Sequence, residues 1–210
     1  MESLALYERS AASSYMKNLV RRLFGRFYWV TYSSALRYKG LWINGFFEGQ
    51  GELKYSNGTK FSGTFSNGLK HGKGILVSSS GYRYEGDWVK GKKTGFASIR
   101  YKNGDGFEGE VKDGLRHGTG QLHDALSKLS FKGSWHKDII RGDVNISSAS
   151  WCFEGPMPNS DGLTRGEMRY SDSSIYLGNL KDFIHHGAGS LRSSSGCLLY
   201  TSDAADDLGR

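Results

Sequence analysis

The strongest constraint on this chain is a repeat of about 23 residues that fills most of the sequence. Each copy opens with an aromatic residue, has glycine two positions later and a large apolar residue four positions later. Fifteen positions after the aromatic, every copy has an aliphatic residue or methionine. The opening aromatics are Tyr38, Phe61, Tyr84, Phe107, Phe131, Phe153 and Tyr176. Self-similarity at such a period indicates a repeat architecture in which neighbouring copies share one core.

The spacing inside a copy predicts strands rather than helices. Apolar residues alternate with polar neighbours, which is the period of a half-buried strand, and glycine is too frequent for helices. Glycines such as Gly45 and Gly68, and the pair Asn57-Gly58, fall where the chain must turn, so each copy predicts a β-hairpin. Glycines within the strands leave room on the buried face for an aromatic ring of an adjoining strand.

The pattern Tyr-x-Gly-x-Trp-x-x-Gly-x-x-x-Gly-x-Gly resembles the MORN repeat, and the first four of about seven copies in residues 38–198 match it closely. The resemblance implies an all-β fold, an elongated single-layer twisted antiparallel sheet of stacked β-hairpins (a MORN-repeat solenoid). It also implies interaction rather than catalysis.

The fifth and sixth copies depart from this pattern. Asp138 and Ser160 replace the turn glycine, and Val144 fills the second position of Gly-x-Gly. Pro156 and Pro158 interrupt an expected strand. Since proline cannot donate to a strand ladder, we expect an irregular or bent region at residues 153–162.

The two ends of the chain differ from the repeats. Residues 1–25 are basic with apolar residues at helical spacing, which predicts a short N-terminal helix that caps the open end of the sheet; a membrane-surface helix or disorder are the alternatives. Val30 and Tyr32 are in phase with the repeat, so we expect the array to span residues 26–198. Residues 199–210 have an unrelated composition and are expected to be a disordered tail.

Composition limits the compartment and the partners. The formal net charge of +7 favours anionic partners without selecting among them. No stretch of apolar residues is long enough to span a bilayer, and no secretory signal is evident. Cys152 and Cys197 show no metal or redox spacing, so we expect a reducing compartment. These features favour a cytoplasmic protein, at the periphery of a membrane or the cytoskeleton in one alternative.

Motifs that would carry chemistry are weak. His71, His117 and His186 share one offset but lie two or more repeats apart, too far to converge on one metal ion. A strand follows each Gly-x-Gly, where a phosphate site needs a helix. The carboxylates Glu85, Asp87, Glu108 and Glu110 fall on the outward face, which predicts a solvated surface with cross-strand pairs. We therefore predict no enzyme activity and no catalytic, cofactor-binding or metal site.

Two sets of residues remain as candidates for binding. The first set consists of aromatics, for which a role in the sheet core is the competing interpretation: Tyr38, Trp42, Phe65, Tyr84, Trp88 and Trp135. The second set is a basic stripe expected along the hairpin turns, suited to an anionic membrane surface, unless it only solubilises the turns. It comprises Lys70, Lys73, Lys90, Lys92, Lys93, Lys112, Arg116, Lys137 and Arg141. Nucleic acid is disfavoured because the aromatics occupy buried positions.

The sequence thus predicts a non-catalytic scaffold that mediates protein–protein interaction, in one version at a membrane surface. Two alternatives stay open. The chain is the regulatory N-terminal region of a larger enzyme such as a phosphatidylinositol-phosphate kinase, as in some proteins with similar repeats, or it is a peripheral binder of anionic phospholipids. A protein partner is expected, with anionic membrane lipid as a second candidate and no small-molecule substrate.

Overall fold

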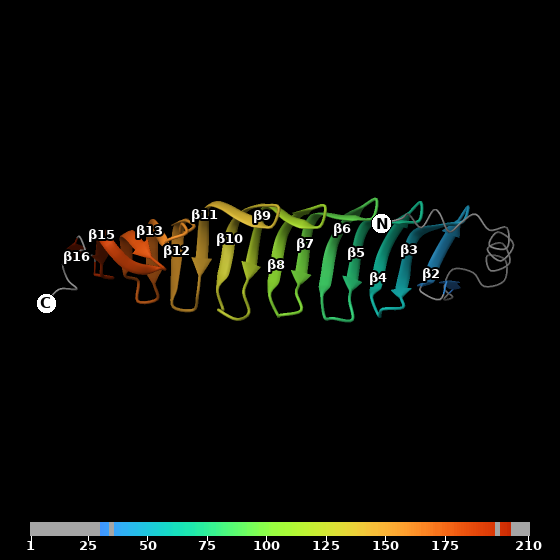
Figure 1. Cartoon of the computed structure of the whole chain (residues 1–210), viewed down its shortest axis with the longest axis horizontal. Coiled ribbons are helices and arrows are strands. Elements are labelled where there is room, and N and C mark those ends of the chain that lie inside the picture. Colours follow the sequence, from blue (N-terminus) through green and yellow to red (C-terminus); the bar gives the residue numbers. More distant parts are fainter. Residues whose placement is uncertain (1–29, 34–35, 196–197, 203–210) are drawn as a thin grey trace. The chain divides into compact units, whose positions relative to one another are not determined.

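The protein is seen in a computed structural model, which describes residues 30–33, 36–195 and 198–202 (Figure 1). These residues form strands and the turns and loops between them. The expected N-terminal helix within residues 1–25 and the expected start of the array at residue 26 lie outside the described residues. Within the described ranges, no helix has the length and hydrophobicity needed to cross a membrane.

The strands follow one another with short connections. Their bounds are β1 Val30–Ser33, β2 Leu36–Ile43, β3 Phe46–Tyr55, β4 Lys60–Ser66, β5 Leu69–Val77, β6 Arg83–Val89, β7 Lys92–Arg100, β8 Gly106–Lys112, β9 Leu115–His123, β10 Ser130–His136, β11 Ile139–Ser147, β12 Trp151–Pro156, β13 Leu163–Tyr170, β14 Ile175–Lys181, β15 Ile184–Arg192 and β16 Leu198–Ser202.

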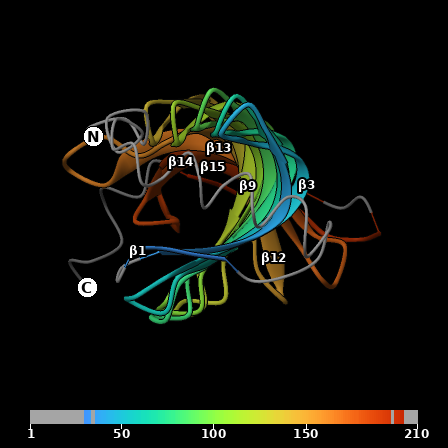
Figure 2. The ribbon, with the colours of Figure 1, turned by 90° about the vertical axis from the view of Figure 1, so that its right-hand side faces the viewer.

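The chain forms two compact units. Unit 1 contains Met1–Lys102 and Val111–Gly114, and unit 2 contains Asn103–Glu110 and Leu115–Arg210. In unit 1 the strands β1 to β7 pair antiparallel in chain order, and in unit 2 the strands β9 to β16 do the same. The predicted all-β antiparallel sheet of successive hairpins is therefore confirmed within each unit. Figure 2 shows that the strands of unit 1, such as β3, curve along their length.

Two-residue turns close the hairpins, and both turn residues have positive φ, as in a type I′ turn. Asn44 and Gly45 have φ of 50° and 87°, and Asn67 and Gly68 have φ of 49° and 79°. Where glycine is replaced, the same turn persists: Asp138 has φ of 69° after Lys137 at 49°. The loss of the turn glycine in the fifth copy thus changes the residue but not the turn.

The first glycine of each Gly-x-Gly marks a β-bulge. In the β2–β3 ladder Gly40 faces Gly51 and Leu41 faces Glu48, so Gly49 and Gln50 have no partner on β2. Gly49 adopts φ of 63°, in the left-handed region that glycine enters without steric cost. The same shift recurs in the β4–β5 and β6–β7 ladders.

The second glycine of each Gly-x-Gly lies beneath an aromatic ring. Gly63 and Gly74 face each other across the β4–β5 ladder, and a Cβ on Gly74 would come 2.5 Å from the ring of Phe61. In the first copy, a Cβ on Gly51 would lie 2.6 Å from the phenol oxygen of Tyr38. These rings are almost fully buried, with 1% of Phe61 and 0% of Tyr38 exposed. The predicted packing of rings on side-chain-free backbone is confirmed.

The region around the two prolines is irregular, as predicted. The β12–β13 ladder ends at Glu154 and its partner Glu167, although β12 still pairs with β11 as far as Pro156. Residues 157–162 form a loop in place of a two-residue turn. The Thr164 hydroxyl donates a hydrogen bond to the carbonyl of Pro156 across this loop, at 2.6 Å.

One boundary in the sequence analysis is wrong. Residues 199–202 were expected in a disordered tail, but they belong to β16, which pairs antiparallel with β15. The physical reason is that an edge strand offers unpaired backbone groups to any extended segment, whatever its side chains. Residues 203–210 lie outside the described residues.

Candidate binding face

The predicted aromatic contact residues form the core of the sheet. Exposed fractions are 0% for Tyr38 and Tyr84, 1% for Phe65, 3% for Trp88 and 6% for Trp135. Trp42 is half-buried and contacts the Tyr38 ring edge-on, with centroids 5.4 Å apart. Five of the six side chains therefore have almost no surface left for a partner, which matches the core interpretation.

The side chains that cover these rings come from another position of the repeat. The second residue after each two-residue turn faces the large apolar residue across the ladder, as Lys70 faces Phe65 and Lys93 faces Trp88. We call these the cover positions. They are Phe47, Lys70, Lys93, Arg116, Ile140 and His185.

Two lysines occupy the cover positions of the second and third copies, in unit 1. The Lys70 ammonium lies 5.3 Å from the ring centroid of Phe61, 5.4 Å from that of Tyr55 and 5.1 Å from that of Trp88. Burial lowers the pKa of this ammonium below its ordinary value. The charge therefore sits above aromatic faces, a favourable cation–π arrangement.

Lys93 makes a similar set of contacts one hairpin further on. Its ammonium lies 4.6 Å from the ring centroid of Tyr82, 4.9 Å from that of Tyr84 and 5.9 Å from that of Trp88. It donates a hydrogen bond of 2.7 Å to the Tyr82 hydroxyl. Burial and, second, repulsion from Lys70 lower its pKa. The two ammonium groups thus share the Trp88 ring.

Unit 2 carries different chemistry at the cover positions. The guanidinium of Arg116 stacks over Trp135, with its central carbon 4.4 Å from the ring centroid, and is ion-paired with Asp138 at 3.1 Å. His185 stacks on Tyr176 with centroids 3.7 Å apart, and its Nε2 is hydrogen-bonded to the Tyr170 hydroxyl at 2.7 Å. Burial lowers the pKa of His185.

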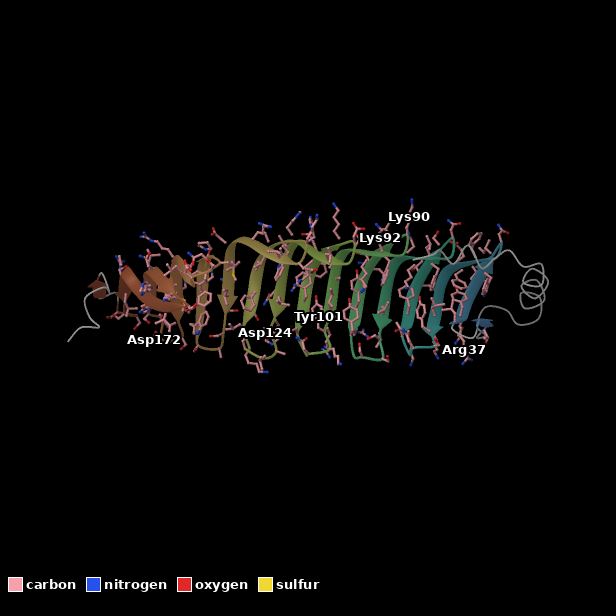
Figure 3. All side chains as sticks on the ribbon, in the orientation of Figure 1. Arg37, Lys90, Lys92, Tyr101, Asp124 and Asp172 are labelled. Atoms are coloured by element: carbon pink, nitrogen blue, oxygen red, sulfur yellow. The ribbon has the colours of Figure 1, made fainter. Side chains whose placement is uncertain are left out.

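The predicted basic stripe is divided among several surfaces in unit 1. Lys90 and Lys92 project from the turn edge (Figure 3), and Lys92 is ion-paired there with Asp113 at 2.9 Å. Lys73 is paired with Asp87 at 2.8 Å on the face opposite to the rings. The prediction is wrong for Lys70, Lys93 and Arg116, which lie over the rings, because neighbouring residues of a strand point to opposite faces. The remaining predicted members Lys112, Lys137 and Arg141 are exposed.

Polar contacts are seen for three of the four predicted outward carboxylates, and the predicted cross-strand ion pair is seen at Asp87. Asp87 is bound by Lys73 from the neighbouring strand, and Glu85 by Arg83 at 2.7 Å. Glu110 accepts hydrogen bonds from the Thr119 amide at 3.0 Å and the Thr119 hydroxyl at 2.9 Å. These hydrogen bonds lower the pKa of Glu110, as expected when a bond stabilises the charged form.

Sequence reasoning missed the cover positions, although the signal was present. Each lies nine residues after an opening aromatic, from Phe47 after Tyr38 to His185 after Tyr176. The residue type varies between copies, so the position does not appear in a search for shared residues. The strand register and the bulge at the first glycine of Gly-x-Gly direct this side chain toward the ring, and neither can be read from the residue type.

Comparison with protein families identifies the repeats. The family model described as the MORN repeat matches residues 38–60, 61–81, 84–106 and 107–125. The chain contains MORN repeats. The matches cover the first four of the seven predicted copies. Of the later copies, those opening at Phe131 and Tyr176 keep the two-residue hairpin turn, in MORN-like hairpins β10–β11 and β14–β15.

Similar solved structures include three domains of the proteins SAS-4 and CPAP. The TCP domain of Drosophila melanogaster SAS-4 (dCPAP), in complex with a proline-rich motif of Ana2 (dSTIL), is 14% identical with a TM-score of 0.47, and the match covers 71% of the MORN-repeat chain and 81% of that chain. The TCP10 domain of Danio rerio CPAP, in complex with a STIL peptide, is 12% identical with a TM-score of 0.46, covering 73% and 68%.

The third structure is the TCP10c domain of Drosophila melanogaster Sas-4, which is 14% identical with a TM-score of 0.48, and the match covers 73% of the MORN-repeat chain and 93% of that chain. At these identities and TM-scores the similarity assigns no function. A comparison with curated proteins found no match.

Proposed function

We propose that this MORN-repeat chain is a non-catalytic scaffold for protein–protein interaction and that, within each unit, the cover positions form a binding face. The sheet is built from the same residue types in copy after copy, with rings over glycine. The side chain above each ring differs between copies, from phenylalanine to lysine, arginine, isoleucine and histidine. This difference is the observation that carries the proposal.

Repeat proteins bind partners through positions that differ between copies. Each repeat contacts its neighbours through fixed positions, while the remaining surface positions are free to differ and together make an extended binding surface. Aromatic rings and long cationic side chains are enriched at the centres of protein interfaces. The cover positions provide both kinds of group, because a half-buried cationic side chain such as Arg116 lies over an aromatic ring.

Affinity capture with the full chain tests this proposal. Proteins retained by the wild type are identified, and one is purified and its affinity is measured for two double variants. Arg116→Ser with His185→Ser changes the cover face of unit 2. Arg83→Ser with His123→Ser removes the same residue types from exposed positions and serves as the matched control.

We expect the cover variant to weaken the measured affinity by about tenfold or more, since hydrogen bonds to charged groups contribute about 1.5–3 kcal/mol each. The control variant should bind like the wild type. Capture no greater than that of an unrelated β-protein of similar charge would overturn the proposal. So would a partner whose affinity falls equally in both variants.

A further inference from the structure

The two ammonium groups over Trp88 have no carboxylate partner among the described residues. The ion pairs of unit 1 use Lys73, Arg83 and Lys92, which point elsewhere. The contacts of Lys70 are aromatic, and the hydrogen bond of Lys93 goes to a neutral phenol. Two half-buried positive charges therefore lie near one ring, and neither forms an ion pair with a described carboxylate.

Lys70, Lys93 and Tyr82 have hydrogen-bond donors that the described residues do not use. An ammonium has three N–H donors, and Lys93 uses one of them on the Tyr82 hydroxyl. Burial and, second, the neighbouring Tyr101 raise the pKa of Tyr82 to about 12, so its hydroxyl keeps a proton at neutral pH. Because that oxygen already accepts from Lys93, its own hydrogen can be donated. The remaining donors of Lys70, Lys93 and Tyr82 suit an acceptor-only, negatively charged group.

The surroundings add apolar surface. Tyr55, Tyr82 and Tyr101 are half-buried, and the Tyr82 and Tyr101 rings lie 6.0 Å apart. A residue next to the anionic group would thus meet aromatic rings, which supply large contact area at low entropic cost.

We propose that Lys70, Lys93 and Tyr82, on the floor formed by Trp88, bind a side-chain carboxylate of an acidic segment in a protein partner, with the neighbouring apolar residue of that segment on the tyrosine rings. The inference rests on the proposed scaffold function and specifies the chemistry of the partner for unit 1.

A protein segment fits this place better than a membrane does. Lys70 and Lys93 lie over the rings. Lys90 and Lys92 project from the turn edge (Figure 3). A flat anionic surface would meet the projecting pair first. The strands of unit 1 are curved (Figure 2), and an extended chain can follow such a surface where a bilayer cannot.

The test uses the full chain with ¹³C-labelled lysine and a blocked peptide, Ser-Gly-Glu-Leu-Glu-Leu-Glu-Gly-Ser. Its counterpart carries glutamine in place of each glutamate. The Cε–Hε resonances report on each lysine separately, and they detect binding even when it is weak. Assignments come from the single Lys→Met variants.

We expect the glutamate peptide to shift the resonances of Lys70 and Lys93 with one common dissociation constant. The glutamine peptide should bind at least about tenfold more weakly, because charge-assisted hydrogen bonds are lost. Lys70→Met with Lys93→Met, which keeps the stems over the rings, should reduce binding of the glutamate peptide to the level of the glutamine peptide. The matched control is Lys90→Met with Lys92→Met, which should stay within about twofold of the wild type at 0.15 M salt.

Three outcomes contradict the inference. The first is equal shifts at Lys90, Lys92, Lys70 and Lys93, which would mean diffuse charge attraction. The second is no shift at Lys70 and Lys93 at millimolar peptide. The third concerns vesicles of phosphatidylcholine and phosphatidylserine at a ratio of about four to one. Lys70→Met with Lys93→Met would weaken binding to these vesicles more than binding to the glutamate peptide, as expected for a membrane surface. Loss of peptide binding with partner capture intact contradicts only this inference, whereas failed capture with peptide binding intact contradicts only the scaffold proposal.

Discussion

Val144 faces Gly133 across the β10–β11 ladder, at the position where other hairpins have glycine or alanine. Val144 is buried, with 2% of it exposed, and a Cβ on Gly133 would meet its Cγ1 at 3.3 Å. In this copy the opening ring, Phe131, is only half-buried. By contrast, Ala97 faces Gly86 and the Tyr84 ring stays fully buried. The site beneath the ring thus accepts one methyl group but not an isopropyl group.

This relationship predicts different costs for removing two rings of the same unit. Phe153 has 0% of its surface exposed and lies against Gly155 and Gly166. Phe153→Ala should lower the free energy of unfolding by about 3–5 kcal/mol, as for other buried phenylalanines. Phe131→Ala should cost about 1–2 kcal/mol, because part of its ring is already in water. Urea unfolding followed by circular dichroism measures both values, and equal costs would contradict the account.

A methyl group on Gly63, which lies in the same strand as the ring of Phe61, should destabilise unit 1. A Cβ on Gly63 would lie 2.6 Å from the Cα of Gly74 and from the carbonyl oxygen of Lys73. Both atoms belong to backbone, which cannot rotate away. We therefore expect Gly63→Ala to lower the free energy of unfolding by about 1–3 kcal/mol, the usual cost of overpacking.

The matched control lies next to it on the same strand. Ser62 is exposed, so Ser62→Ala should change the free energy of unfolding by no more than about 0.5 kcal/mol. If both variants unfold at the urea concentration of the wild type, the close approach of the two strands at Gly63 is not required for stability.

The packing of rings on glycine could be predicted from sequence because it depends on residues that recur at fixed offsets. Tyr38, Gly40 and Gly51 show it in the first copy, and the same offsets carry it through unit 1. The cover positions could not be predicted in this way. Lys70 and Lys93 are adjacent to turns, where lysine is usually solvated, and only the strand register turns these two side chains toward the rings.

The hairpin turn of the fifth copy is a site for stabilisation. Lys137 has φ of 49°, which costs a residue with a Cβ about 1–2 kcal/mol, although asparagine pays less. Asn44 and Asn67 occupy the same place in the first two copies. Lys137→Asn should therefore raise the free energy of unfolding by about 0.5–1 kcal/mol. A thermal melt should show the higher midpoint.

A lysine-to-asparagine substitution in the strand before this turn should instead lower the free energy of unfolding. Lys132 is exposed in β10, and asparagine is depleted in strands. We expect Lys132→Asn to lower the midpoint slightly. A lower midpoint for Lys137→Asn would show that the lysine side chain contributes more than its backbone conformation costs.

The β16 strand shows a second limit of sequence reasoning. In its pairing with β15, Ser190 lies opposite Thr201 and Leu191 opposite Tyr200, and backbone hydrogen bonds join the two strands. Such bonds need no repeat pattern, so a segment that departs from the repeat can still extend the sheet. A search for recurring residues finds the repeats but not a strand that uses the open edge they leave.

The stacked imidazole of His185 gives unit 2 a pH-dependent stability. Burial lowers its pKa below the ordinary value of 6.5, so the unfolded chain binds a proton at higher pH than the folded chain does. Stability from this residue is therefore complete above about pH 6.5 and is lost as the pH falls below it. The imidazole stacks on the Tyr176 ring and is hydrogen-bonded to the Tyr170 hydroxyl, and its partial removal from water disfavours the charged form.

His185→Phe separates this effect from other titrating groups. Phenylalanine already occupies the cover position of the first copy, where Phe47 stacks on Tyr38 at 3.9 Å. The wild type should lose more of its free energy of unfolding between pH 7.5 and pH 5 than His185→Phe does, by a few tenths of a kcal/mol (about 0.2–0.5), because solvent screens the exposed imidazole. His186→Gln, at the exposed neighbouring position, should keep the wild-type difference. A His185→Phe variant with the full wild-type pH dependence would place the titrating group elsewhere, because removing the stacked imidazole must remove its linkage to folding.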